Sequence, residues 1–171
     1  MLRILDIFFS GIAIIFLFPA IIIIILILSV TGEREIFYKQ KRVGKNKVIF
    51  EILKFATMHK DSENKGAGTV TLKNDPRVLP FGKFLRKTKL NELPQLFNIL
   101  MGQMSVIGPR PLHQKQFNFY SEDDQKMISS IRPGLSGVSS IIFRDEEKIF
   151  QNSDDPDKTY KEKISPKKAE L

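Results

Sequence analysis

The chain has 171 residues, with 27 Lys and Arg against 19 Asp and Glu, which gives a formal net charge of +8. This length allows one domain with a modest core in addition to a membrane anchor. The absence of cysteine excludes disulfides, thiolate metal sites and a cysteine nucleophile.

The charge is distributed unevenly along the chain. Only Arg3 and Asp6 are charged before residue 32, so the positive excess lies behind an apolar segment. Such a basic body is expected on the cytoplasmic side of a membrane, where it attracts anionic lipid or phosphorylated substrates. A basic surface without a particular partner would have the same composition, so charge alone does not decide between them.

The apolar segment covers residues 12–30, and fifteen of these nineteen residues are Ile, Leu, Val or Phe. The run is long enough for a membrane helix and too long for the apolar part of a cleaved signal peptide. Pro19 lies near its middle, where a proline removes a backbone donor and kinks a helix. A kinked helix can span the membrane or bend back as a re-entrant hairpin with both ends on the cytoplasmic face. The residues alone leave both topologies open.

Two short strands are predicted next, at residues 36–40 and 47–53, and a turn at residues 42–46 joins them. Residues 62–77 are polar, and their glycines and proline predict an irregular loop. Its last three residues, Asp75-Pro76-Arg77, are interpreted as a turn rather than a site.

Helices are predicted at residues 81–86, from about Asn91 onward, and over residues 114–131. Asn91 suits the N-cap of the second helix, because asparagine side chains accept hydrogen bonds from the first turn. Residues 151–171 are polar and charged, and are predicted to be loosely ordered. The expected fold class is α+β, with short strands and short amphipathic helices at the membrane interface.

Five sequence blocks resemble one known family in the same order. They are FYKQKRVG (37–44), LKFATM (53–58), LPFGKFLRKTKLNELPQLFNIL (79–100), GQMSVIGPRP (102–111) and IRPGLSG (131–137). Together they resemble the bacterial sugar transferases known as monotopic phosphoglycosyl transferases. The ordered set is far more specific than any one block.

The resemblance implies a membrane step in the synthesis of a bacterial surface glycan such as capsule, O-antigen or exopolysaccharide. It implies transfer of sugar-1-phosphate from a UDP-sugar to polyprenyl (undecaprenyl) phosphate, with release of UMP and a requirement for Mg²⁺. The implied partners are the UDP-sugar donor, the polyprenyl phosphate acceptor and membrane lipids, and no nucleic acid is expected. The catalytic part is expected on the cytoplasmic face of the inner membrane.

The resemblance also implies a division of the chain into parts. It implies a re-entrant membrane helix in residues 1–32, a catalytic domain in residues 33–150 and a shortened polar tail in residues 151–171. The family bends its helix at a Ser-Pro pair, and this chain has Phe18-Pro19 there, so the proline is kept and the serine is not.

The site residues implied by the resemblance lie mainly in the third block. An Asp-Glu pair supplies the covalent nucleophile and a metal ligand in the family, and Asn91-Glu92 occupies these positions here. Glu92 is therefore expected to hold the metal. The expected substrate contacts are Arg110, which is fixed between two prolines, and Arg132, Lys54, Thr57, Arg86 and Gln95.

Asn91 departs from the family at the nucleophile, since an amide cannot form an acyl phosphate as a carboxylate does. The chain could act by another route, with Glu92 as nucleophile or with direct attack by the acceptor phosphate. It could instead be a catalytically impaired relative that serves as a binding or scaffold protein. A third class, a basic membrane-anchored protein that binds anionic polymers, would show steep salt dependence but does not explain the ordered blocks.

Overall fold

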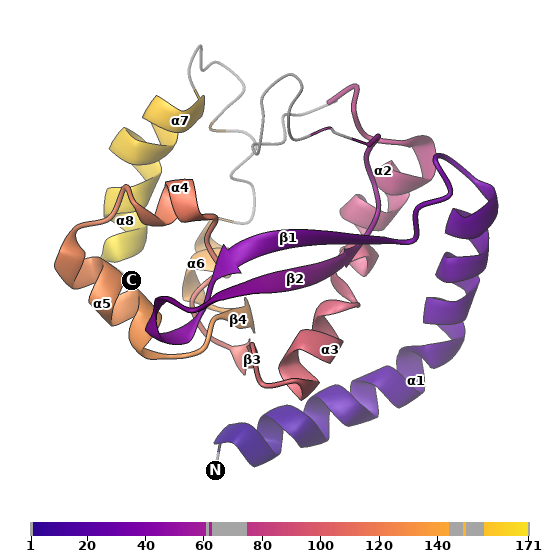
Figure 1. Cartoon of the computed structure of the whole chain (residues 1–171), viewed down its shortest axis with the longest axis horizontal. Coiled ribbons are helices and arrows are strands. Elements are labelled where there is room, and N and C mark those ends of the chain that lie inside the picture. The colour runs from indigo at the N-terminus through magenta and orange to yellow at the C-terminus, as the bar shows by residue number, and fades with distance from the viewer. Residues whose placement is uncertain (1, 61, 63–74, 144–148, 150–155, 171) are drawn as a thin grey trace. The chain divides into compact units, whose positions relative to one another are not determined.

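The computed structural model describes residues 2–60, 62, 75–143, 149 and 156–170 (Figure 1). These residues form two compact units, each made of two stretches of chain. The first unit comprises Met1–Gln40 and Ile52–Met101, and the second comprises Lys41–Glu51 and Gly102–Leu171. The mixture of a long apolar helix, short helices and short strands confirms the α+β class.

The first unit begins with α1 (Leu2–Val30), a helix of 29 residues that is long and apolar enough to cross a membrane. Figure 1 shows that its axis changes direction along its length. Pro19 lies inside the helix and removes one backbone hydrogen bond, which accounts for a bend. The buried residues are separated by three, four or eleven positions, which are close to whole turns, and so mark one face of the helix: Asp6, Ser10, Ile21, Ile24 and Leu28.

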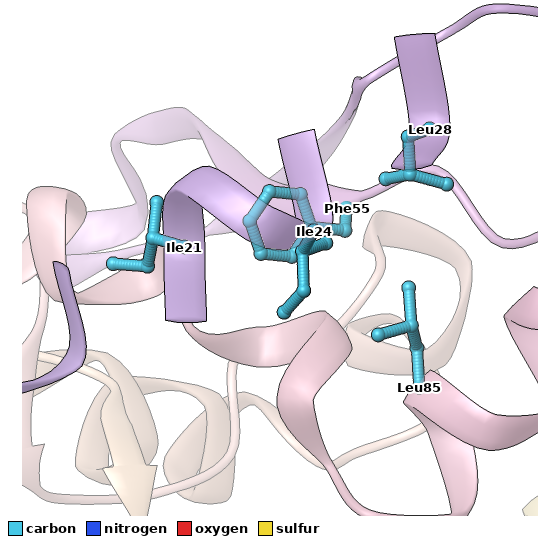
Figure 2. Packing of buried hydrophobic residues seen from close by; sticks show 5 residues of the cluster. All are labelled: Ile21, Ile24, Leu28, Phe55 and Leu85. Atoms are coloured by element: carbon cyan, nitrogen blue, oxygen red, sulfur yellow. The ribbon is translucent and has the colours of Figure 1, made fainter. Parts of the chain in front are cut away.

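The core of the first unit forms where the second half of α1 meets the rest of the unit. Ile21, Ile24 and Leu28 pack with Phe55 and Leu85 (Figure 2). Burying such side chains stabilises the fold by roughly 1.5–3 kcal/mol each. The remaining apolar face of α1 is exposed, as an element in contact with lipid would be.

The segment that leaves α1 is tied to the same unit by a polar cluster. Glu33 Oε1 lies 2.8 Å from His59 Nδ1, and Lys60 N donates to Glu33 Oε2 at 2.7 Å. The hydrogen bond from His59 lowers the pKa of the Glu33 carboxyl below its usual value. His59 has no role in the sequence-based expectations. In the structure it fixes the segment just after α1 through Glu33.

The hairpin confirms the two predicted strands, although the first is longer than predicted and the second begins and ends two residues later. β1 (Phe37–Val43) and β2 (Ile49–Phe55) form a two-stranded sheet, and a short 3₁₀ turn, η1 (Lys45–Lys47), joins them. Asn46 and Lys47 adopt left-handed φ angles of 55° and 62°, which moves the reversal of the chain later than predicted. The chain enters the second unit along β1 and returns along β2.

Helix α2 (Pro80–Lys87) confirms the helix predicted at residues 81–86. The helix predicted from Asn91 is wrong in its start, because α3 covers Gln95–Leu100 and Asn91 lies in the 3₁₀ turn η3 (Leu90–Glu92). Asn91 is therefore not an N-cap. Pro94 cannot donate a backbone hydrogen bond to the preceding turn, so the α-helix begins only after it.

In the second unit, β3 (Ser105–Ile107) pairs in parallel with β4 (Gly134–Ser136). The single helix predicted over residues 114–131 is wrong, since the structure has α4 (Gln114–Phe117) and α5 (Glu122–Ser130). Ser121 begins α5 by accepting a hydrogen bond from Asp124 N, and this cap separates the two helices. α6 (Val138–Ile142) follows β4.

The prediction that the C-terminal segment is loosely ordered is wrong over residues 156–169. The segment forms α7 (Pro156–Thr159), the π-helical turn η5 (Tyr160–Ile164) and α8 (Ser165–Ala169). Tyr160 and Ile164 are fully buried, and Lys168 Nζ lies 5.1 Å from the ring centres of both Phe143 and Tyr160. Two apolar anchors and one cation over two aromatic rings thus order a mostly charged sequence.

Most of the predicted loop at residues 62–77 lies outside the described residues. Its described end confirms the turn, because Arg77 donates to the Asp75 carboxylate through its backbone N and through Nε, at 3.0 and 2.9 Å. Arg77 Nη1 also donates to Ser62 O at 2.6 Å.

Two sequence blocks in the first unit meet at a glycine. Leu79 N donates to Thr57 O at 2.9 Å, and a Cβ added to Gly82 would lie 2.2 Å from that same Thr57 oxygen. The first turn of α2 therefore rests directly on the backbone that follows β2. Only glycine allows this approach.

We expect Gly82→Ala to destabilise the protein by about 1–3 kcal/mol, because the new methyl group must displace backbone atoms. Thermal unfolding in detergent micelles measures the change. Gly11→Ala is the matched control, since nothing lies within 4 Å of a Cβ added there. Equal unfolding temperatures for the two variants would show that this contact does not constrain α2.

Candidate functional site

The structure brings together two of the residues predicted for the site, Lys54 and Glu92. Lys54 lies on β2 and Glu92 ends the turn η3, and Lys54 Nζ lies 3.8 Å from Glu92 Oε1. Their side chains are 18% and 21% exposed. A cation and a carboxylate thus share a partly shielded position that solvent and a ligand can still reach.

A partly buried hydrogen bond joins the two elements beside this pair. Asn98 on α3 is 0% exposed, and its Oδ1 accepts from Leu53 N at 2.9 Å. Leu53 precedes Lys54, and α3 follows Glu92, so this bond fixes the strand against the helix beside the pair. Sequence reasoning missed Asn98, although a lone amide among Leu96, Phe97 and Ile99 was the available signal.

Asn91 contrasts with Asn98. It is 7% exposed, and its Oδ1 has no hydrogen-bond partner among the described residues. Leaving a buried acceptor unpaired costs roughly 1–3 kcal/mol. Such an atom beside Glu92 has an unused capacity to accept a hydrogen bond or to bind a cation.

Three other predicted residues lie in the same unit. Gln95, the first residue of α3, and Thr57 are buried, whereas Arg86 in the last turn of α2 is partly exposed. The carbonyl of Thr57 accepts from Leu79 N, so its backbone has a structural role. A substrate contact of each of these side chains stays a prediction.

Arg110 and Arg132 lie in the second unit, where two further blocks of the sequence pack together. Gly108 N donates to Ser136 O at 2.9 Å, and Gly134 N donates to Pro109 O at 2.8 Å. A Cβ on Gly134 would lie 2.1 Å from Gly108 N, so this contact also requires glycine.

The two arginines differ in their surroundings. Arg132 Nε donates to Gly102 O at 2.7 Å, which commits part of its guanidinium to holding the loop before β3. Arg110 is exposed and lines a pocket of about 10 Å³, room for roughly one water molecule, beside Pro109 and Pro133. Arg110 is thus the more available of the two for an anion.

The Asn91-Glu92 pair fits a Mg²⁺ ion only as part of a shared site. No group of three or more His, Cys, Asp or Glu residues that could hold a metal occurs among the residues that the structure describes. Mg²⁺ is commonly held by one or two carboxylates, with waters and substrate phosphates completing its shell. One carboxylate and one unpaired amide oxygen match that arrangement.

These features define a protein with a long apolar helix joined to a unit that carries a lysine-carboxylate pair and an unpaired amide. The class is that of membrane-associated bacterial transferases, as the family match shows. The chain belongs to the bacterial sugar transferase family, which it matches over residues 1–168. The expected family is therefore confirmed.

Several enzymes and biosynthetic proteins are similar to this chain. The exopolysaccharide production protein ExoY of Rhizobium meliloti is 34% identical over 155 residues, which are 82% of this chain and 68% of the relative. The UDP-glucose:undecaprenyl-phosphate glucose-1-phosphate transferase of Klebsiella pneumoniae is 35% identical over 81% of this chain and 30% of the relative. A putative undecaprenyl-phosphate N-acetylgalactosaminyl 1-phosphate transferase of Bacillus subtilis is 41% identical over 64% of this chain and 60% of the relative.

The two buried asparagines allow a direct test of the site's hydrogen bonding. We expect Asn98→Leu to destabilise the protein by about 1–3 kcal/mol, because the Leu53 N–H loses its acceptor. The same change at Asn91 should be neutral or stabilising, since no hydrogen bond to its Oδ1 is lost. Chemical unfolding of both variants in the same detergent gives the difference, and equal losses would contradict the assignment.

Proposed function

We propose that the chain transfers sugar-1-phosphate from a UDP-sugar to polyprenyl phosphate and releases UMP, as a membrane step of surface glycan synthesis. Family membership carries this proposal, together with the named donors and acceptors of the similar enzymes. The Lys54–Glu92 pair supports it, because phosphoryl transfer needs charge neutralisation at the diphosphate. Residues 33–150 would form the transferase part.

We also propose that α1 is re-entrant, so that both of its ends face the cytoplasm. Near its start, Arg3 donates to carbonyls of α3, and its second half packs on Phe55 and Leu85. Just after it, Glu33 bonds to His59 and Lys60. A straight spanning helix would carry one end to the far side of the membrane, whereas this helix contacts the same unit near its start and over its second half.

Exposed apolar side chains in this unit suit contact with the bilayer. Phe84 on α2, and Phe97 and Met101 at α3, are exposed although they are large and apolar. They belong to the unit that contains α1. We propose that these short helices lie at the membrane interface, where a lipid-borne acceptor and a soluble donor meet.

In the proposed site, Glu92 and the amide oxygen of Asn91 would hold Mg²⁺, which supplies charge neutralisation on the donor diphosphate when bound. Lys54 pairs with Glu92 and is itself placed to contact phosphate oxygens. Arg110 and Arg132 are proposed as further phosphate contacts, and Thr57, Arg86 and Gln95 as residues that line the donor site.

We propose direct transfer from donor to acceptor, because the amide of Asn91 is not a nucleophile. An oxygen of the acceptor phosphate forms a bond to the sugar-bearing phosphorus of the donor. The bond from this phosphorus to the bridging oxygen breaks, and its electron pair leaves with UMP. An impaired relative that acts as a scaffold is the second candidate, and Asn91 is the observation that favours it.

The basic activity is tested with membranes that contain the chain, a panel of UDP-sugars and polyprenyl phosphate. We expect Mg²⁺-dependent release of UMP with at least one donor, and a loss of about a hundredfold or more in Glu92→Gln, which removes the carboxylate charge. Glu35→Gln is the control, since Glu35 pairs with Lys60 at 3.1 Å near the end of α1. No release with any donor would favour the scaffold.

The route is tested by isotope exchange. Direct transfer predicts that labelled UMP does not exchange into the UDP-sugar when the acceptor is left out, whereas a covalent enzyme intermediate permits that exchange. We expect no exchange in the native chain and a gain of exchange in Asn91→Asp. Exchange in the native chain would point to Glu92 as the nucleophile. Turnover only in Asn91→Asp would identify an impaired enzyme.

A further inference from the structure

Arg3 makes an unusual contact for a residue in the first turn of an apolar helix. Its Nη1 donates to Ile99 O, and its Nη2 donates to Leu100 O at 2.6 Å. These are the last two residues of α3, where helical carbonyls lack their usual donors. The planar fork of a guanidinium suits two neighbouring carbonyls, and its positive charge suits the C-terminal end of a helix.

This contact extends the buried face of α1 to its start. Asp6 and Ser10 are buried one and two turns beyond Arg3, on the same face as Ile21, Ile24 and Leu28. Polar residues face the unit in the first half of the helix, and apolar residues face it in the second half. Arg3 therefore lies at the start of this face, which is buried at residues 6 and 10 and again over residues 21–28.

The helix that Arg3 contacts, α3, lies next to the candidate site. Glu92 lies three residues before α3, and Asn98 within α3 holds Leu53 through its 2.9 Å hydrogen bond. Leu53 is followed by Lys54, whose Nζ lies 3.8 Å from Glu92. α3 thus adjoins both partners of the ion pair, Glu92 through the chain and Lys54 through the Asn98–Leu53 hydrogen bond.

We propose that Arg3 is a positioning residue, which makes the geometry of the Lys54–Glu92 pair depend on how the membrane helix is seated. Arg3 touches no substrate and acts only through the C-terminal carbonyls of α3. This inference rests on the proposed function for its kinetic consequence, whereas its structural consequence can be measured without turnover.

The test uses the full chain in nanodiscs of phosphatidylethanolamine and phosphatidylglycerol. Arg3→Gln removes the cationic fork, and Arg3→Lys keeps the charge with a single ammonium group. Arg34→Gln is the matched control, because Arg34 is an exposed arginine just beyond the other end of α1. It reports what the loss of one positive charge near the membrane does by itself.

We expect Arg3→Gln to lower kcat per folded molecule by about ten- to a hundredfold, with little change in KM for the UDP-sugar, because misplaced groups weaken the chemical step. Arg3→Lys should recover only part of kcat, since an ammonium cannot reproduce the fork. Arg34→Gln should retain the native kcat. Full recovery of kcat in Arg3→Lys, or equal losses of kcat in Arg3→Gln and Arg34→Gln, would overturn the inference. Either result would show that Arg3 contributes only a positive charge near the membrane.

Hydrogen exchange gives the second readout. Arg3→Gln should speed amide exchange in peptides covering residues 95–101 and 49–55, and Arg34→Gln should not. Native exchange in both peptides of Arg3→Gln would overturn the inference even if activity fell. If the native chain releases no UMP from any donor, the proposed function fails, and exchange still decides whether Arg3 holds α3 and β2.

Discussion

The partly buried hydrogen bond from Leu53 N to Asn98 Oδ1 is the contact on which the candidate site depends. It joins a strand and a helix that lie 45 positions apart in the sequence. It fixes the strand that carries Lys54 against α3, beside the 3.8 Å ion pair. A weak, partly exposed ion pair contributes little to stability by itself, so its placement must come from the frame around it.

Glycines set the close contacts between the sequence blocks. Gly82 brings α2 onto the backbone at Thr57 in one unit, and Gly134 brings the strand β4 against Gly108 in the other. In both places a side chain would collide with backbone atoms rather than with a flexible group. Some residues of the blocks that identify the family are therefore needed for backbone packing. This packing also positions the charged residues of the same blocks.

The sequence was a good guide where structure is local, and a poor one where it depends on distant contacts. The long apolar helix, the hairpin and α2 follow from composition and spacing, and they were predicted. The break before α5 depends on a single serine cap, and the order in residues 156–169 depends on Tyr160 and Ile164 reaching a core elsewhere. Lys54 and Glu92 were each predicted, but their pairing and the role of Asn98 required the fold.

The interleaved path of the chain has a consequence for folding during synthesis. The two compact units alternate along the chain, since the hairpin leaves the first unit at residue 41 and returns to it at residue 52. The ribosome therefore releases the tip of the hairpin long before the segments after residue 101 that complete its unit. The tip can pack into its unit only after those later segments have been made. For the same reason, no cut at a single peptide bond can separate one whole unit from the other.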